Sequence, residues 1–160
     1  MKRWTPFLIL ATVALMTTVF VGPSEAGDKK EIVGAWYVDT IGAPFAPHAI
    51  SFHADGIVDL TNPDAAEATN SSSAGMGEWV STKTGYKGVF IEVNADKATN
   101  QFTTLLRVTF EVQVNGSTFQ GPATAEYFDG NRNLVAGPFP ADLRGQRITV
   151  GGPVPDPIDP

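Results

Sequence analysis

The stretch from residue 102 to residue 128 constrains the fold of this chain more than any other part of it. Over residues 102–114, every second position belongs to a mostly apolar face, and the positions between them are polar except for Leu105. Successive side chains of a β-strand point to opposite faces of the sheet, so this pattern predicts a half-buried strand. Asn115-Gly116 follows and favours a type I′ turn, so the whole stretch is predicted to be a long β-hairpin.

The returning arm of this hairpin carries small residues on the face that should point inward. That face holds Phe119, Gly121, Ala123, Ala125 and Tyr127. Because large residues of the first arm face glycine and alanine on the second, we expect a curved sheet with room inside it. The hairpin therefore predicts a fold class and a place for a ligand, without identifying the ligand.

Short apolar runs separated by turn residues recur along the rest of the chain. Further strands are predicted at residues 31–39, 48–53, 57–61, 77–82, 88–94, 134–137 and 145–150. The polar residues 62–74 are expected to form a surface loop that either covers a pocket mouth or is disordered. No stretch repeats apolar residues every 3.6 positions, as an amphipathic helix would. The fold class is therefore all-β, an antiparallel up-and-down β-barrel of eight or nine strands.

Residues 1–26 are predicted to be a secretory signal peptide that is cleaved after Ala26. Lys2 and Arg3 precede a long apolar run, and small residues follow it at Ser24 and Ala26. An uncleaved membrane anchor is the alternative, because the run approaches the roughly 20 residues that span a bilayer, but threonines interrupt it. We therefore expect a secreted or periplasmic protein with no stable membrane span after cleavage.

Composition limits what the remaining chain can be. Cleavage leaves residues 27–150 as the barrel domain and the Pro-rich residues 151–160 as an extended, disordered tail. The net charge is −6, and the loss of Lys2, Arg3 and Glu25 makes the domain more acidic, which disfavours nucleic acid as a partner. The chain has no cysteine, which excludes a disulfide framework, thiol catalysis and a thiolate metal site.

A Gly-x-Trp motif, Gly34-Ala35-Trp36, opens the first predicted strand, and Arg147 lies in the last one. This pattern resembles the lipocalin and calycin family, and small exported bacterial β-barrel proteins of unassigned activity. In that family the tryptophan closes one end of the barrel and an arginine packs across its ring. The resemblance implies this barrel-closing role for Trp36 and Arg147, with Arg144 as the second choice for the arginine. The alternative is that Trp36 and Trp79 are core residues packed beside glycines.

Few residues are candidates for chemistry. His48 and His53 would point to opposite faces of one strand, so a shared metal site is not expected, and surface or turn roles are favoured for both. Glu92 alternates with Phe90, and an inward position would raise its pKa through desolvation. For both Glu92 and Glu78 we favour a position facing solvent. No calcium, phosphate, nucleophile or zinc motif occurs, so neither a metal nor another cofactor is expected.

Three functions agree with these patterns. The favoured one is an exported lipocalin-like protein that binds a small, mostly apolar ligand in the barrel interior. The second is a small β-barrel isomerase or cyclase that uses the same cavity, with Glu92, Tyr127 and His53 as catalytic candidates. The third is a structural or interaction module of the cell envelope without a ligand. The predicted ligand-binding residues are Trp36, Trp79, Phe90, Leu106, Val108, Phe110, Phe119, Gly121, Ala123, Ala125 and Tyr127. Nothing in the sequence indicates the oligomeric state.

Overall fold

The computed structural model describes residues 31–42, 47–61 and 68–155, and all of its regular elements are β-strands. Among these residues there is no helix that could cross a bilayer. The predicted signal peptide and the last residues of the predicted tail lie outside the described residues. The strands are β1 (Gly34–Ile41), β2 (His48–Phe52), β3 (Ile57–Leu60), β4 (Asn70–Ser72), β5 (Gly75–Ser81), β6 (Tyr86–Asp96), β7 (Phe102–Asn115), β8 (Thr118–Phe128) and β9 (Leu134–Arg147).

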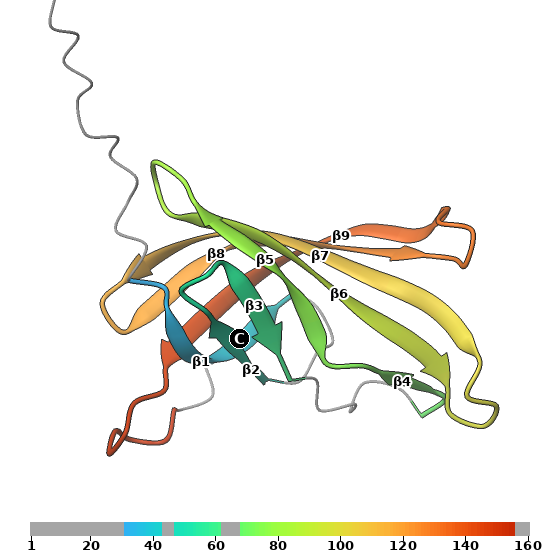
Figure 1. The fold of residues 1–160 in the computed structure, drawn as a ribbon, viewed down its shortest axis with the longest axis horizontal. Coiled ribbons are helices and arrows are strands. Elements are labelled where there is room, and N and C mark those ends of the chain that lie inside the picture. The colour runs from blue at the N-terminus through green and yellow to red at the C-terminus, as the bar shows by residue number, and fades with distance from the viewer. Residues whose placement is uncertain (1–30, 43–46, 62–67, 156–160) are drawn as a thin grey trace, which may run out of the picture.

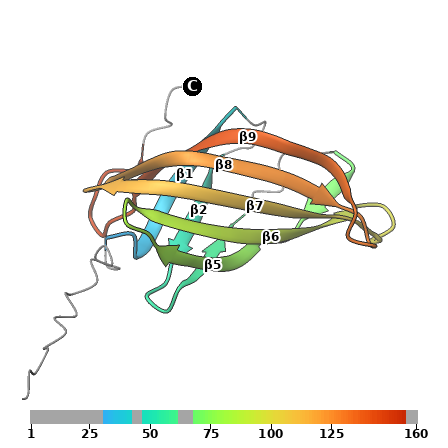
Figure 2. The same ribbon diagram turned by 90° about the horizontal axis from the view of Figure 1, so that it is seen from above.

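Eight of these strands close into an antiparallel barrel (Figures 1 and 2). In the order β1, β2, β3, β5, β6, β7, β8, β9, each strand pairs with the next, and β9 pairs with β1 to complete the circle. The additional strand, β4, pairs with the far end of β6. The all-β, up-and-down barrel predicted from evenly spaced apolar runs is therefore confirmed.

The predicted hairpin is formed by β7 and β8, but its turn lies one residue later than expected. Asn115 pairs with Thr118, so Gly116 and Ser117 are the two turn residues. Gly116 has a φ of +61°. Glycine at the first turn position with positive φ is typical of a type II′ turn rather than type I′. Because glycine supplies this conformation, Asn115 remains in the strand.

The last two predicted strands are in fact one strand, β9. Residues 134–137 and 145–150 were expected to be separate strands, but β9 runs without interruption over residues 134–147. Pro138 and Pro140 lie in the part of β9 that pairs with β8 alone, because β1 reaches only as far as Asp142. A strand with one unpaired side tolerates residues that lack an N–H donor.

The expected loop at residues 62–74 contains strand β4. This short strand pairs with residues 94–96 of β6, beyond the point where pairing with β5 ends. The Ser72 hydroxyl donates to Asn94 Oδ1 at 2.7 Å. A partner strand therefore outweighs the weak intrinsic strand preference of serine and asparagine.

The barrel has two unlike ends, which we call the floor end and the projecting end. At the floor end β1 begins, β9 ends, and short turns at residues 53–56, 82–85 and 116–117 join the strands. At the projecting end β6 to β9, each 11 or 14 residues long, run on past the shorter β1, β2 and β3 (Figure 1). The interior of the barrel therefore continues into a curved sheet of four long strands.

Candidate functional site in the barrel interior

The interior is the candidate site, because the predicted ligand-binding residues all occupy inner-face positions. Phe90 pairs with Val108, and Val108 with Ala125, across three neighbouring strands. Directly paired residues of antiparallel strands point to the same face, and the same alternation places the other predicted residues inside. The structure thus brings the predicted set to one face, while its contact with a ligand stays a prediction.

Aromatic rings fill the floor half of the interior. The Phe52 ring lies at the centre, 5.9 to 6.2 Å from the ring centroids of Phe110, Phe119 and Trp79. Phe119 in turn contacts Trp36, with 5.0 Å between centroids. All four contacts are edge-to-face, an arrangement worth about 0.5–1.5 kcal/mol beyond the burial of the rings. Phe52 is not among the residues predicted to line the interior, although alternation in β2 places it there.

Arg147 lies over Trp36 and covers the floor. Its guanidinium carbon is 4.1 Å from the centroid of the indole ring, which is cation–π contact distance. Nη1 donates to the carbonyl oxygen of Val33 at 2.8 Å, and Nη2 donates to that of Glu31. Gly34 leaves room for this arginine, because a Cβ there would lie 2.7 Å from Nη1, and its φ of +136° disfavours side chains. Packing therefore explains both residues of the Gly-x-Trp motif, because Gly34 leaves room for Arg147 and Arg147 stacks on Trp36.

The indole N–H groups of Trp36 and Trp79 bind backbone carbonyls at the floor end. Trp36 Nε1 donates to the carbonyl of Ile32 at 2.8 Å. Trp79 Nε1 donates to the carbonyls of His53 and Ile57 at 3.0 and 3.1 Å. Both indole rings are buried, so these bonds satisfy donors that water does not reach. Both tryptophans therefore stabilise the floor through packing and through hydrogen bonds.

The small residues of β8 differ in their surroundings. A Cβ at Gly121 would collide with the carbonyl oxygen of Glu111, so the backbone of β7 already occupies that space. Ala123 is buried beside its partner Phe110. Ala125 lies further towards the projecting end and also points inward. Of the three, Ala125 is the one that pairs with the half-exposed Phe139.

Polar side chains line the inner face of the projecting half. Asn94 Oδ1 accepts a hydrogen bond from Ser72, and Asn94 Nδ2 donates to Thr104 Oγ1 at 3.0 Å. These bonds join β4, β6 and β7. Asn94 is buried, and a buried amide without partners would cost about 1–3 kcal/mol. Asn94 and Thr104 are absent from the predicted site, although Asn94 follows Glu92 by two residues on the same face.

Glu92 points inward, contrary to the prediction that it faces solvent. It is 4% exposed and alternates with the buried Phe90 and Asn94 along β6. Burying a carboxylate costs free energy unless neighbouring groups form hydrogen bonds with it, and the inner face carries polar groups near Glu92. The same prediction for Glu78 is confirmed, because Glu78 is exposed on the outer face of β5.

Glu92 and Tyr127 lie on either side of one strand. Glu92 pairs with Leu106, and Leu106 pairs with Tyr127. Strands lie about 4.8 Å apart, so the Cα atoms of Glu92 and Tyr127 are roughly 10 Å from each other. Leu106, which lies between them, is itself buried. The structure thus brings together two of the three catalytic candidates.

Phe139 adds a half-exposed ring to the same region. It pairs with Ala125 on the inner face, and its centroid lies 6.3 Å from that of Tyr127. Even so, it is 50% exposed. The prolines on either side of Phe139 conceal the strand pattern, and only the register with β8 reveals the inner position. Protein side chains therefore leave about half of this ring uncovered.

His53 lies apart from Glu92 and Tyr127, at the opposite end of the barrel. His53 is in a turn at the floor end, where its Nε2 is 2.9 Å from Asp59 Oδ2 and about half of its side chain is exposed. His48 begins β2 at the other end and pairs with Val38, an inner-face position. Within the part of the chain that the structure describes, no group of three acidic or histidine side chains could hold a metal ion.

The chain was compared with protein-family models, with curated proteins and with solved structures. None of them matches it. The closed antiparallel barrel is compatible with a calycin-like fold. Because one fold hosts many functions, the function has to be argued from the site itself.

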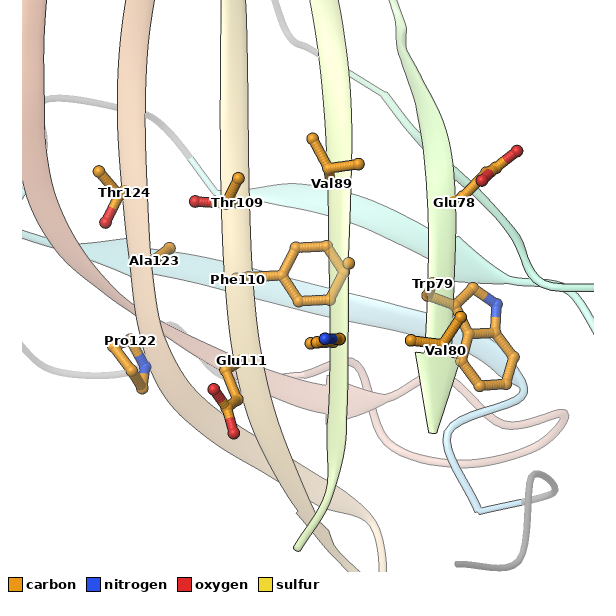
Figure 3. A pocket seen from close by; sticks show the side chains of 12 residues that line it. Glu78, Trp79, Val80, Val89, Thr109, Phe110, Glu111, Pro122, Ala123 and Thr124 are labelled. Carbon is orange, nitrogen blue, oxygen red and sulfur yellow. The ribbon is translucent and has the colours of Figure 1, made fainter. Parts of the chain in front are cut away.

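Two hollows lie on the outer face of the barrel. One, of about 510 Å³, crosses β5 to β8 (Figure 3), and the other, of about 500 Å³, crosses β7 to β9 and reaches the turn before β6. Glu111 and Pro122 line both hollows. Between them the β7–β8 pairing is interrupted and resumes at Gln113 and Gln120, since proline has no N–H to donate.

Aspartates fix the two turns at the projecting end. Asp129 accepts hydrogen bonds from the side chain and backbone of Asn133, and these lower the pKa of its carboxyl. Asp96 accepts bonds from the hydroxyl and backbone N–H of Thr99, which likewise lower the pKa of Asp96. Both carboxylates thus stabilise the turns in which they lie.

Proposed function

We propose that this protein binds a small, mostly apolar molecule in the projecting half of the barrel interior, in the manner of an exported lipocalin-like protein. The observation that carries this proposal is the half-exposed ring of Phe139 beside Tyr127, on the inner face above a floor already filled with rings. Apolar surface that solvent reaches inside a barrel is surface that an apolar ligand would cover with a gain in free energy.

The polar groups of the same face suggest that the ligand carries a hydrogen-bonding group. Glu92, Thr104 and Tyr127 border the apolar positions Leu106 and Ala125. Binding sites for small molecules combine a mainly apolar wall with a few polar groups that orient the ligand. An apolar body with one hydroxyl or similar group fits this arrangement.

Filling the interior beside Phe139 tests the proposal. We expect Ala125→Phe to weaken binding of the neutral apolar dye N-phenyl-1-naphthylamine about tenfold or more, because the new ring occupies the proposed site. Thr124→Phe is the matched control, since Thr124 lies on the outer face one residue away. Dye fluorescence titrations of both variants and the wild type give the dissociation constants.

Two results would contradict interior binding. One is equal dye affinity in all three proteins, and the other is a loss confined to Thr124→Phe, which would move the site to the outer hollow. A wild-type protein that binds no dye and no co-purifying molecule would favour the structural module.

An isomerase or cyclase is the second candidate, because Glu92 and Tyr127 flank one strip of the inner face. Such an enzyme would hold a folded substrate against the wall while these two groups assist proton movement. Chromatographic separation and NMR of the molecules that co-purify with the wild type, Glu92→Gln and Tyr127→Phe test this. Different isomers in wild type and variants would support catalysis, and identical ones would restrict the protein to binding.

A further inference from the structure

The outer faces of β5 and β6 carry exposed aliphatic side chains. Met76 pairs directly with Ile91, and Val89 and Val93 lie two positions from Ile91 on either side, so these side chains adjoin one another. Single exposed apolar residues are ordinary on a protein surface, whereas a contiguous apolar patch marks an interaction site. The whole set, which we call the aliphatic patch, is 36% to 66% exposed and consists of Ile57, Met76, Val80, Val89, Ile91 and Val93.

Lysines gather around the aliphatic patch. The described residues contain three lysines, which are Lys83 in the turn before β6, Lys87 within β6, and Lys97 in the turn after it. Lys83 and Lys87 are exposed and form no ion pair with the described residues. A lysine at the border of apolar surface lays its stem on that surface and keeps its ammonium group in water, where it can meet a phosphate.

The 510 Å³ hollow lies beside the patch and carries both signs of charge. In Figure 3, Val89 and Thr109 lie in one row across the strands, and Val80 and Glu111 lie in the next. Lys87 pairs with Glu111 and also lines the hollow. The two valines belong to both the hollow and the patch. One continuous surface thus offers a cation, a carboxylate and a hydroxyl next to exposed aliphatic side chains.

We propose that this surface docks on a bilayer of zwitterionic phospholipid, with the aliphatic patch against the acyl chains and one headgroup in the hollow. In this arrangement Lys87 and the Thr109 hydroxyl donate hydrogen bonds to the headgroup phosphate, and Glu111 accepts them from an ammonium headgroup or faces a choline. The docking does not depend on a ligand in the barrel interior.

The composition of the surface favours a lipid over a protein partner. The patch holds only valine, isoleucine and methionine, and lysines border it. Interfaces between proteins are enriched in aromatic residues and depleted of lysine. At a lipid surface, in contrast, apolar side chains enter the boundary between headgroups and acyl chains while lysines reach the phosphates. The net charge of −6 favours a zwitterionic bilayer, because an anionic one repels an acidic chain.

Glu78 limits how deeply the surface enters the bilayer. It is exposed on the outer face of β5 and pairs with Val89, so it lies among the aliphatic side chains. A carboxylate moved among acyl chains loses its hydration without compensation. The docking is therefore shallow, within the roughly 5–10 Å that interfacial elements reach.

Flotation with lipid vesicles tests the docking. We expect the purified protein to float with phosphatidylcholine vesicles, and Ile91→Asp to lower its partition coefficient about tenfold or more, because a charge then enters the apolar boundary. Val135→Asp is the matched control, since Val135 is a similarly exposed aliphatic residue on β9, outside the patch. Addition of phosphatidylglycerol to the vesicles should weaken binding.

A second pair of variants tests the place of the headgroup. We expect Lys87→Gln to lower the partition coefficient about fivefold, because it removes the cation from the hollow. Lys83→Gln is the control, since Lys83 lies in the turn before β6. Equal losses in these two variants overturn the headgroup site. A protein that does not float, equal losses in Ile91→Asp and Val135→Asp, or tighter binding to the anionic vesicles overturns the docking itself.

A fluorescent label tests which side of the barrel meets the bilayer. The chain has no cysteine, so Ile91→Cys and Val135→Cys each introduce a single thiol for a nitrobenzoxadiazole label. On phosphatidylcholine vesicles, we expect the emission of the label at residue 91 to shift to the blue, and that of the label at residue 135 to stay as in water. Equal shifts at both residues, or no shift at residue 91, overturn the proposed orientation.

Discussion

The floor half and the projecting half of the interior share the long strands β6 to β9, yet their contents are opposite. In the floor half, Trp36 of β1 and Phe52 of β2 meet Phe110 and Phe119 in edge-to-face contacts, and Trp79 of β5 meets Phe52 in the same way. In the projecting half, β6 to β9 have no facing β1 to β3, and Glu92, Asn94 and Phe139 line the inner face. The difference teaches that aromatic rings fill the interior where strands face one another, whereas polar groups and the half-exposed ring of Phe139 line the strands that extend past them.

Truncating the same residue type in each half gives the largest expected contrast. We expect Phe119→Ala to destabilise the protein by about 3–5 kcal/mol, because it leaves a cavity between Trp36 and Phe52. Phe139→Ala should cost about 1 kcal/mol, because its ring is half exposed. Urea denaturation monitored by circular dichroism measures both. Equal losses would mean that the two halves are packed alike.

Arg147→Met tests whether the cover over the floor is energetically important. The substitution removes the stacking on Trp36 and the hydrogen bonds to two backbone carbonyls, so we expect a loss of about 1–3 kcal/mol. Arg144→Met is the matched control, since Arg144 is exposed and should change stability by about 0.5 kcal/mol or less. Thermal unfolding gives the melting temperatures of both variants. Similar melting temperatures would show that Arg147 does not stabilise the floor.

Asn94→Ala tests how much the hydrogen bonds of the projecting half contribute to stability. It removes the hydrogen bonds to Ser72 and Thr104, so we expect a loss of about 1–2 kcal/mol and faster amide exchange in β4. Val93→Ala, its exposed neighbour, serves as the comparison and should leave exchange in β4 unchanged. If exchange in β4 is unaffected by Asn94→Ala, the short strand is held by its backbone pairing alone.

The smallest effect is expected from acid at the projecting end. The folded pKa values of Asp96 and Asp129 are lowered below the ordinary value of 3.8, so the unfolded chain binds protons first as the pH falls. Their contribution to stability is therefore complete above that value and is lost as the pH falls through the folded values. Asp96→Asn with Asp129→Asn should flatten the change in melting temperature between about pH 5 and about pH 2. An unchanged slope would show that other carboxylates dominate.

Much of the fold was predictable, because alternation reports directly on which face of a strand is buried. The central hairpin and the inner positions of Leu106, Val108 and Phe110 follow from that period alone. Strand β4 and the continuous β9 were not predictable, since their residues have weak strand preference and only their partner strands keep them extended. The candidate site was predictable in its apolar wall but not in Asn94, Thr104 or Phe139.

The alternation in residues 102–114 determined by itself that this chain forms a sheet with one buried face, because the period of two leaves no other regular structure. The alternation of the returning arm also placed Gly121 and Ala125 on the inner face. Only the tertiary structure decided what each of them meets. The backbone of β7 fills the space at Gly121, whereas Ala125 adjoins the half-exposed ring of Phe139. What faces a strand from across the barrel depends on where the other strands end, and no local pattern records that.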